Sequence, residues 1–111
     1  MKLAIVGSFN FCDYNLLKTS LQSYHFNYII SGGKEGADHL AEKYAWQNNK
    51  ILYIFLPDWK KYGASATSIN DQEIVNACNG VLAFWDGKSA ETISVLNYCQ
   101  ELHKPYKIIN F

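Results

Sequence analysis

Arginine is absent from the 111-residue sequence, whose ten basic residues are all lysines and are balanced by ten acidic residues. Bidentate recognition of phosphates and guanines normally uses the planar guanidinium group, which a lysine ammonium cannot reproduce. A net charge of zero also gives no positive field that would gather a polyanion. We therefore expect that long nucleic acids are not partners of this protein.

Cysteine is scarce, and its pattern excludes a disulfide framework. The three cysteines are odd in number, far apart and without a Cys-x-x-Cys pair: Cys12, Cys78 and Cys99. Such usage suits a reducing compartment, and we expect all three to be small, mostly buried hydrophobes. The three histidines do not have the spacing of zinc ligands. The sequence therefore predicts neither a metal ion nor a resident cofactor.

Long apolar runs are missing as well. The opening run, Leu3–Val6, is too short for a signal peptide or a membrane span, so we expect a cytoplasmic protein that makes no membrane contact. The composition is that of a globular protein, with 49% hydrophobic and 15% aromatic residues. The length suits a single domain over residues 1–111.

Short apolar runs alternate with amphipathic stretches along the chain. We expect five strands, over residues 3–6, 28–30, 51–55, 81–84 and 106–109, of which the first and third are buried. Four helices are expected between them: one capped by Asp13, one from Ala37 to about 48, one from about 67 to 78, and a last one that buries Leu102. Residues 56–65 have no clear period and are predicted to form an ordered loop.

Strands that alternate with helices, joined by connections long enough for right-handed crossovers, indicate a doubly wound parallel sheet. We predict an α/β fold with a five-stranded parallel sheet in the order 3-2-1-4-5 and helices on both faces. Ligands of such sheets bind outside the carboxyl ends of the strands, where the strand order reverses. Three turns should meet there, at residues 7–8, 31–38 and 85–89.

The turn at Ser31–Asp38 carries the strongest local signal. It contains Gly32, Gly33 and Gly36, follows an apolar strand and opens an amphipathic helix. This arrangement presents unpaired backbone amides and the positive end of a helix dipole to an anion, so we predict a phosphate cradle. The glycines match neither the dinucleotide fingerprint nor a Walker loop, and a tight turn without a ligand stays an equal alternative.

Several spaced motifs resemble the SLOG superfamily. They are Gly7-Ser8, Ser31-Gly32-Gly33-x-x-Gly36-Ala37-Asp38, Pro57-x-Trp59-x-x-Tyr62-Gly63, Asn70-x-Gln72-x-x-Val75 and Ala83-Phe84-Trp85-Asp86-Gly87-x-Ser89-x-x-Thr92. The chain is most similar to the short YspA-like branch, which is related to the LOG phosphoribohydrolases and the DprA/Smf domain. The resemblance implies a Rossmann-like domain that self-associates and binds a nucleotide-derived ligand related to NAD or ADP-ribose.

The hydrolases among these relatives carry an arginine at the first turn and a glutamate in the last helix, where this chain has Phe9 and Val95. We therefore expect binding without turnover, of an NAD- or ADP-ribose-like molecule or a cyclic nucleotide signal. The protein would act as a sensor or as a sequestering protein of the phage counter-defence type. The alternative is a nucleotide N-glycosidase in which Asp86 or Glu91 replaces the lost acid.

The candidate ligand-binding residues come from all of these turns. Backbone amides at 32–38 and 87–89 are expected to hold a phosphate, and Lys34 and Lys88 would add positive charge. Asp38 would instead take a ribose hydroxyl, while Phe9 or Trp85 would either stack on a base or pack against the protein. The full set is Gly7, Ser8, Phe9, Asn10, Ser31, Gly32, Gly33, Lys34, Gly36, Ala37, Asp38, Asn70, Trp85, Asp86, Gly87, Lys88 and Ser89.

Overall fold

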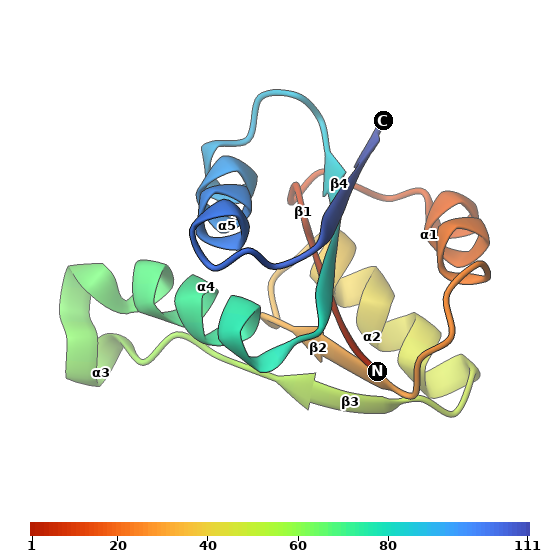
Figure 1. Cartoon of the computed structure of the whole chain (residues 1–111), viewed down its shortest axis with the longest axis horizontal. Coiled ribbons are helices and arrows are strands. Elements are labelled where there is room, and N and C mark those ends of the chain that lie inside the picture. The colour runs from red at the N-terminus through yellow and green to blue at the C-terminus, as the bar shows by residue number, and fades with distance from the viewer.

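The sheet has the predicted strand order. The computed structural model describes all 111 residues, and its five strands pair in parallel in the order β3-β2-β1-β4-β5 (Figure 1). The strands are β1 (Lys2–Gly7), β2 (Tyr28–Ser31), β3 (Ile51–Ile54), β4 (Gly80–Trp85) and β5 (Tyr106–Asn110). The strand order reverses between β1 and β4, which confirms the doubly wound, Rossmann-like α/β prediction.

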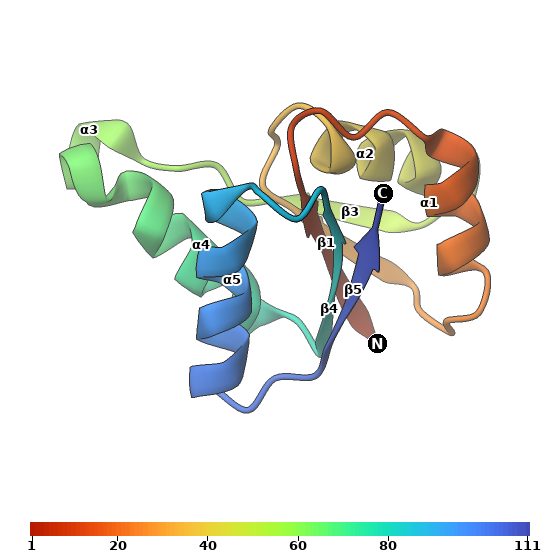
Figure 2. The same cartoon turned by 90° about the horizontal axis from the view of Figure 1, so that it is seen from above.

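Helices cover both faces of the sheet. Figure 2 shows α1 (Tyr14–Leu21) and α2 (Ala37–Gln47) on one side of it, and α4 (Ala66–Ala77) and α5 (Ala90–Glu101) on the other. Each pair buries an apolar face against the strands, as helices of a layered α/β fold do. None of the helices combines the length and the apolar content that crossing a bilayer requires.

Residues 56–65 are more regular than the sequence predicted. Trp59–Tyr62 form a short helix, α3, and Gly63–Ser65 continue as a 3₁₀ turn, η1. The Asp58 carboxylate accepts a hydrogen bond from the Lys61 amide at 3.1 Å, which is how an N-cap residue starts a helix. The loop prediction is therefore wrong over 59–65, and Asp58 was the sequence signal for the helix.

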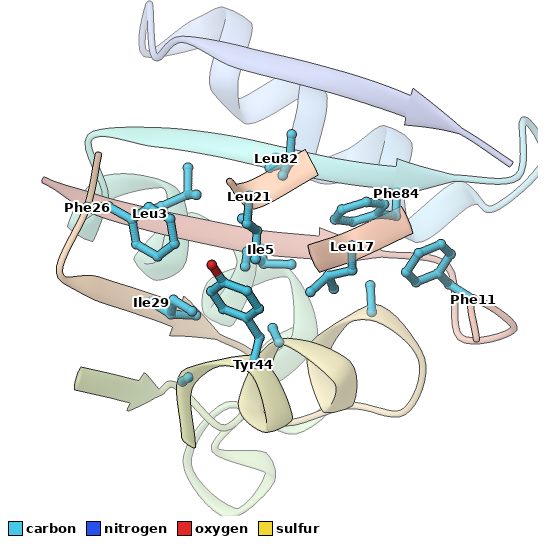
Figure 3. Packing of buried hydrophobic residues seen from close by; sticks show 13 residues of the cluster. Leu3, Ile5, Phe11, Leu17, Leu21, Phe26, Ile29, Tyr44, Leu82 and Phe84 are labelled. Carbon is cyan, nitrogen blue, oxygen red and sulfur yellow. The ribbon is translucent and has the colours of Figure 1, made fainter. Parts of the chain in front are cut away.

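Apolar side chains form one cluster on each face of the sheet. The cluster under α1 and α2 contains Phe11, which stacks on Phe84 with the ring centroids 4.6 Å apart (Figure 3). The cluster under α4 and α5 is built around Ala4, Val6 and Ile30. Because β1 and β4 contribute to both clusters, packing on both faces holds the carboxyl ends of these two strands side by side.

Three burial predictions are wrong, one for an edge strand and two for residues next to helix ends. β3 is an edge strand rather than a buried one, and its Ile51 is 51% exposed. Cys12 is exposed because it lies in the connection before α1, whereas Cys78 and Cys99 are buried as expected. Leu102 follows the end of α5 and is also exposed. Apolar character alone does not place a residue inside, because much of a folded surface is apolar.

Substitutions at Gly36 and Gly87 can distinguish how much stability is lost to backbone strain from how much is lost to steric crowding. Both have a positive φ, 82° and 83°, but a Cβ on Gly36 would lie 2.4 Å from the Ser8 carbonyl oxygen, whereas one on Gly87 would meet nothing within 4 Å. We expect Gly87→Ala to lower the free energy of unfolding by about 1 kcal/mol and Gly36→Ala to lower it by about 3 kcal/mol. Urea unfolding measures both losses. Equal losses would contradict the close approach of Gly36 to the first turn.

Candidate functional site

Three turns meet at the carboxyl edge of the sheet, as predicted. The Ser8 amide donates to the Phe84 carbonyl oxygen at 2.9 Å, and the Asp86 amide donates to Ser8 Oγ at 3.2 Å. A Cβ on Gly7 would lie 2.8 Å from the Cβ of Ala37, so a glycine is needed where β1 passes the start of α2. These contacts join the ends of β1 and β4 to the first turn of α2.

A narrow crevice opens beside these turns, against the α4–α5 layer. Its enclosed volume is about 20 Å³, which is room for about one water molecule. The lining residues are Val6, Gly7, Gly32, Lys34, Asp38, Asp71, Ile74, Glu91, Thr92 and Val95. Four of these ten carry charge, so the crevice is a polar site at the position where ligands bind in doubly wound sheets.

Asp38 is almost completely buried in the wall of the crevice, with 5% of its surface exposed. It lies in the first turn of α2, where the helix dipole favours an acid. Burial raises the pKa of its carboxyl to about 7, although the Lys34 amide and ammonium and the Gly32 amide favour the ionised form. A carboxyl group with this pKa is present in both protonation states near neutral pH, so it can accept or donate a hydrogen bond.

Three amides of the glycine turn, at residues 32–34, are hydrogen-bonded within the chain. The Gly32 and Lys34 amides both donate to Asp38 Oδ2, at 3.2 and 3.3 Å, and the Gly33 amide donates to Ser31 Oγ at 3.2 Å. The side chain of Asp38 thus takes the place that the sequence analysis gave to a bound anion. At residues 32–34 the amides are therefore occupied within the chain, whereas phosphate binding by the other amides of the predicted 32–38 cradle stays a prediction.

Lys34 connects the glycine turn to two acids of the α4–α5 layer. Its ammonium pairs with Glu91 and lies 3.8 Å from Asp71 Oδ1. Burial raises the pKa of Asp71 to about 6, and the charge of Lys34 opposes this rise. With Asp38, three carboxyl groups line the crevice together with this one ammonium. The interior of the crevice is therefore rich in hydrogen-bond acceptors and short of positive charge.

In the turn after β4, backbone amides are also hydrogen-bonded to an acidic side chain of the same turn. The Lys88 and Ser89 amides donate to Asp86 Oδ1, both at 2.9 Å, so these amides are not free for a phosphate either. The same bonds lower the pKa of Asp86, and a carboxylate that stays ionised is a poor general acid. Trp85 Nε1 donates to the Ser89 carbonyl oxygen at 3.1 Å. The indole therefore packs on this turn and is not part of the crevice lining.

Phe9 and Asn10, two further predicted site residues, lie outside the crevice. Phe9 is 75% exposed and lines a separate groove that also contains Phe11 and His39. Phe11 belongs to the α1–α2 cluster and Val6, in the crevice, to the α4–α5 cluster, so the groove and the crevice lie on opposite faces of the sheet. The proposed stacking of a base on Phe9 stays a prediction.

Asp71 lines the crevice, although the sequence analysis did not choose it as a site residue. Asn70 and Asp71 share the buried side of α4 with Ile74 and Val75, which follow them at a spacing of four residues. Polar residues on the apolar face of an amphipathic helix are unusual. That pattern was the signal by which Asp71 could have been found beside the predicted Asn70.

The fold and the crevice define the class of protein: a Rossmann-like α/β domain with a polar crevice at the carboxyl edge of its sheet. Residues 1–62 match the sequence profile of the YspA, cpYpsA-related SLOG family. The gene 61 protein of Mycobacterium phage D29 is 32% identical over 89 residues, covering 75% of this chain and 70% of that protein. The chain belongs to the YspA, cpYpsA-related SLOG family, and the matched range includes Gly7, Gly32, Lys34 and Asp38.

The buried carboxyl of Asp38 makes the stability depend on pH. Its pKa is about 7 in the folded protein and about 3.9 in an unfolded chain. Between about pH 4 and about pH 7 the folded state therefore binds more protons than the unfolded state does. Its contribution to stability is full below about pH 4 and is lost as the pH rises to about 7. We expect Asp38→Asn to remove this part of the slope.

Urea unfolding between about pH 4 and about pH 8 measures the slope. The matched control is Glu101→Gln, which changes an exposed acid at the end of α5 and should leave the slope as it is. An unchanged slope in Asp38→Asn would contradict the assignment to Asp38.

Proposed function

We propose that this protein binds a small phosphorylated nucleotide-derived ligand at the carboxyl edge of the sheet, without turning it over. The observation that carries the proposal is the crevice, which is lined by charged residues of the glycine turn, α2, α4 and α5 where the strand order reverses. Family membership supports a nucleotide-related ligand. The ligands we favour are NAD- or ADP-ribose-like molecules and cyclic nucleotide signals.

The start of α5 suits the phosphate better than residues 32–34 of the glycine turn, whose amides are already hydrogen-bonded. The Ser89 side chain makes no capping hydrogen bond to the backbone of this helix, so the first-turn amides, at residues 90–92, have no acceptor within the helix. Lys34 pairs with Glu91 in the same turn and offsets its negative charge, and Lys88 precedes the turn. A phosphate placed there would lie at the rim of the crevice, with a neighbouring sugar hydroxyl directed inward.

The role we propose is that of a sensor or of a protein that sequesters a nucleotide signal. Phe9 and Val95 stand where the related hydrolases carry an arginine and a glutamate, which supports binding without turnover. Similarity to a phage protein agrees with a counter-defence role. Self-association and a cytoplasmic location stay predictions.

Isothermal titration with AMP, ADP-ribose, NAD and 3′,5′-cyclic AMP tests the proposal. We expect at least one of them to bind with a micromolar Kd, about −8 kcal/mol, and to be recovered intact after the protein is denatured by heat. Lys34→Glu adds a fourth acid to the crevice and should weaken binding at least about tenfold. Lys60→Glu, on the exposed side of α3, is the charge-matched control. Absence of binding to all four compounds, or release of a free base, would contradict the proposal.

One observation favours a second candidate, a nucleotide N-glycosidase. Burial raises the pKa values of Asp38 and Asp71 to about 7 and about 6, where protonated and ionised forms coexist at neutral pH. A protonated carboxyl can donate a proton to the leaving base, and an ionised one can activate water or stabilise the cationic sugar. If the protein is an enzyme, its acids are therefore Asp38 and Asp71, and Glu91 holds Lys34 in place.

Chromatography after a long incubation with AMP or NAD distinguishes the two functions. The second candidate requires release of the free base, and Asp38→Asn and Asp71→Asn should each lower that rate by about 100-fold or more. Asp86→Asn should change it little, because Asp86 closes a turn outside the crevice. Unchanged substrates at high protein concentration would exclude the glycosidase.

A further inference from the structure

The side chain of Asn70 is buried without a hydrogen-bond partner. Only 2% of Asn70 is exposed, yet neither its Oδ1 nor its Nδ2 is bonded to another group of the protein. These two atoms are the only buried side-chain nitrogen and oxygen atoms of the chain in that condition. Burying an amide unpaired is costly, and a leucine of similar size would fill the same place on α4 without that cost. The amide therefore indicates a polar group that is bound from outside the chain.

Asn70 and Asp38 lie on the same side of Gly32, although they come from different helices. A Cβ on Gly32 would be 2.9 Å from Asp38 Oδ2 and 3.8 Å from Asn70 Nδ2. The missing side chain thus leaves open the space beside both polar groups. No hydrogen bond joins Asn70 to Asp38. Asp38 lines the crevice and Asn70 lines the neighbouring hollow with Leu56 and Ile69, so a group that enters past Gly32 would lie between the two side chains.

The chemistry of this place favours a hydroxyl group over a phosphate oxygen. Asp38 accepts hydrogen bonds, and the carboxyls of Asp71 and Glu91 line the same crevice, so a second anion would be repelled. The Asn70 amide adds a donor, Nδ2, beside these acceptors. A hydroxyl donates one hydrogen bond and accepts another, which matches an acid and an amide. The crevice on the Asp38 side of Gly32 has a volume of about 20 Å³, which suits a single hydroxyl group rather than a whole sugar ring.

We propose that Asp38 and Asn70 form a hydroxyl subsite, in which one sugar hydroxyl of the ligand donates to the Asp38 carboxyl and accepts from Asn70 Nδ2. This inference rests on the proposed function, because it requires a nucleotide that places one sugar hydroxyl in the crevice. It specifies the ligand further: the ribose points inward past Gly32, and the phosphate stays outside, at the start of α5. The subsite selects ribonucleotides over the deoxynucleotide that lacks the bound hydroxyl.

Titration of the full chain with AMP, 2′-deoxy-AMP and 3′-deoxy-AMP tests the subsite without any substitution. The expected result is that one of the two deoxy compounds binds about tenfold or more weakly than AMP. Asn70→Leu should bring AMP down to the affinity of that compound, while its urea midpoint is equal to or above that of the unsubstituted protein, since the unpaired amide is gone. Asn76→Leu, at an exposed position of the same helix, should leave the affinity for AMP unchanged.

The outcomes that overturn the subsite differ from those that overturn the proposed function. Equal affinity for AMP and for both deoxy compounds overturns the subsite and leaves nucleotide binding in place. A more stable Asn70→Leu protein with full affinity for AMP also overturns it, since Asn70 would then hold only a water molecule. Failure of every nucleotide to bind removes the proposed function and the subsite together.

Discussion

The bond between Asp38 and the backbone of the glycine turn is the interaction on which the site depends. By accepting hydrogen bonds from the Gly32 and Lys34 amides, the carboxylate ties the end of β2 to the first turn of α2. The turn is ordered by an anion that belongs to the chain, so no bound phosphate is needed to keep it in place. The same carboxylate also makes the crevice acidic, which changes the kind of group that it can hold.

Because of this acidity, the interior of the crevice and its rim differ in charge. Lys34 is the only basic residue among those that line the crevice, and it is shared between Asp71 and Glu91. In a chain without arginine, no second fixed cation can balance the remaining carboxyls. A nucleotide therefore meets a rim where helix amides and lysines suit its phosphate, and an interior where acids and an amide suit its hydroxyls. The two ends of such a ligand are distinguished by charge.

Much of the scaffold could be predicted because its causes are local or follow general rules of topology. The doubly wound parallel sheet follows from alternating strands and helices with right-handed crossovers, and the meeting of the three turns follows from the order in which its strands pair. The fate of the turn amides could not be predicted, because it depends on where the side chains of Asp38 and Asp86 point after folding. The sequence does not distinguish backbone amides that are free from those that are hydrogen-bonded to a nearby acidic side chain.

The sequence by itself determined the parallel sheet, the glycine bends and the family, because apolar period, glycine positions and motif spacing are properties of the linear chain. Only the tertiary structure decided that β3 is an edge and that the predicted phosphate cradle holds a carboxylate of the protein. It also decided that Asp71 and Asn70 of α4 lie next to a turn almost 40 residues earlier in the chain. Such neighbours are set by how the two helical layers pack on the sheet, and that packing depends on all the side chains at once.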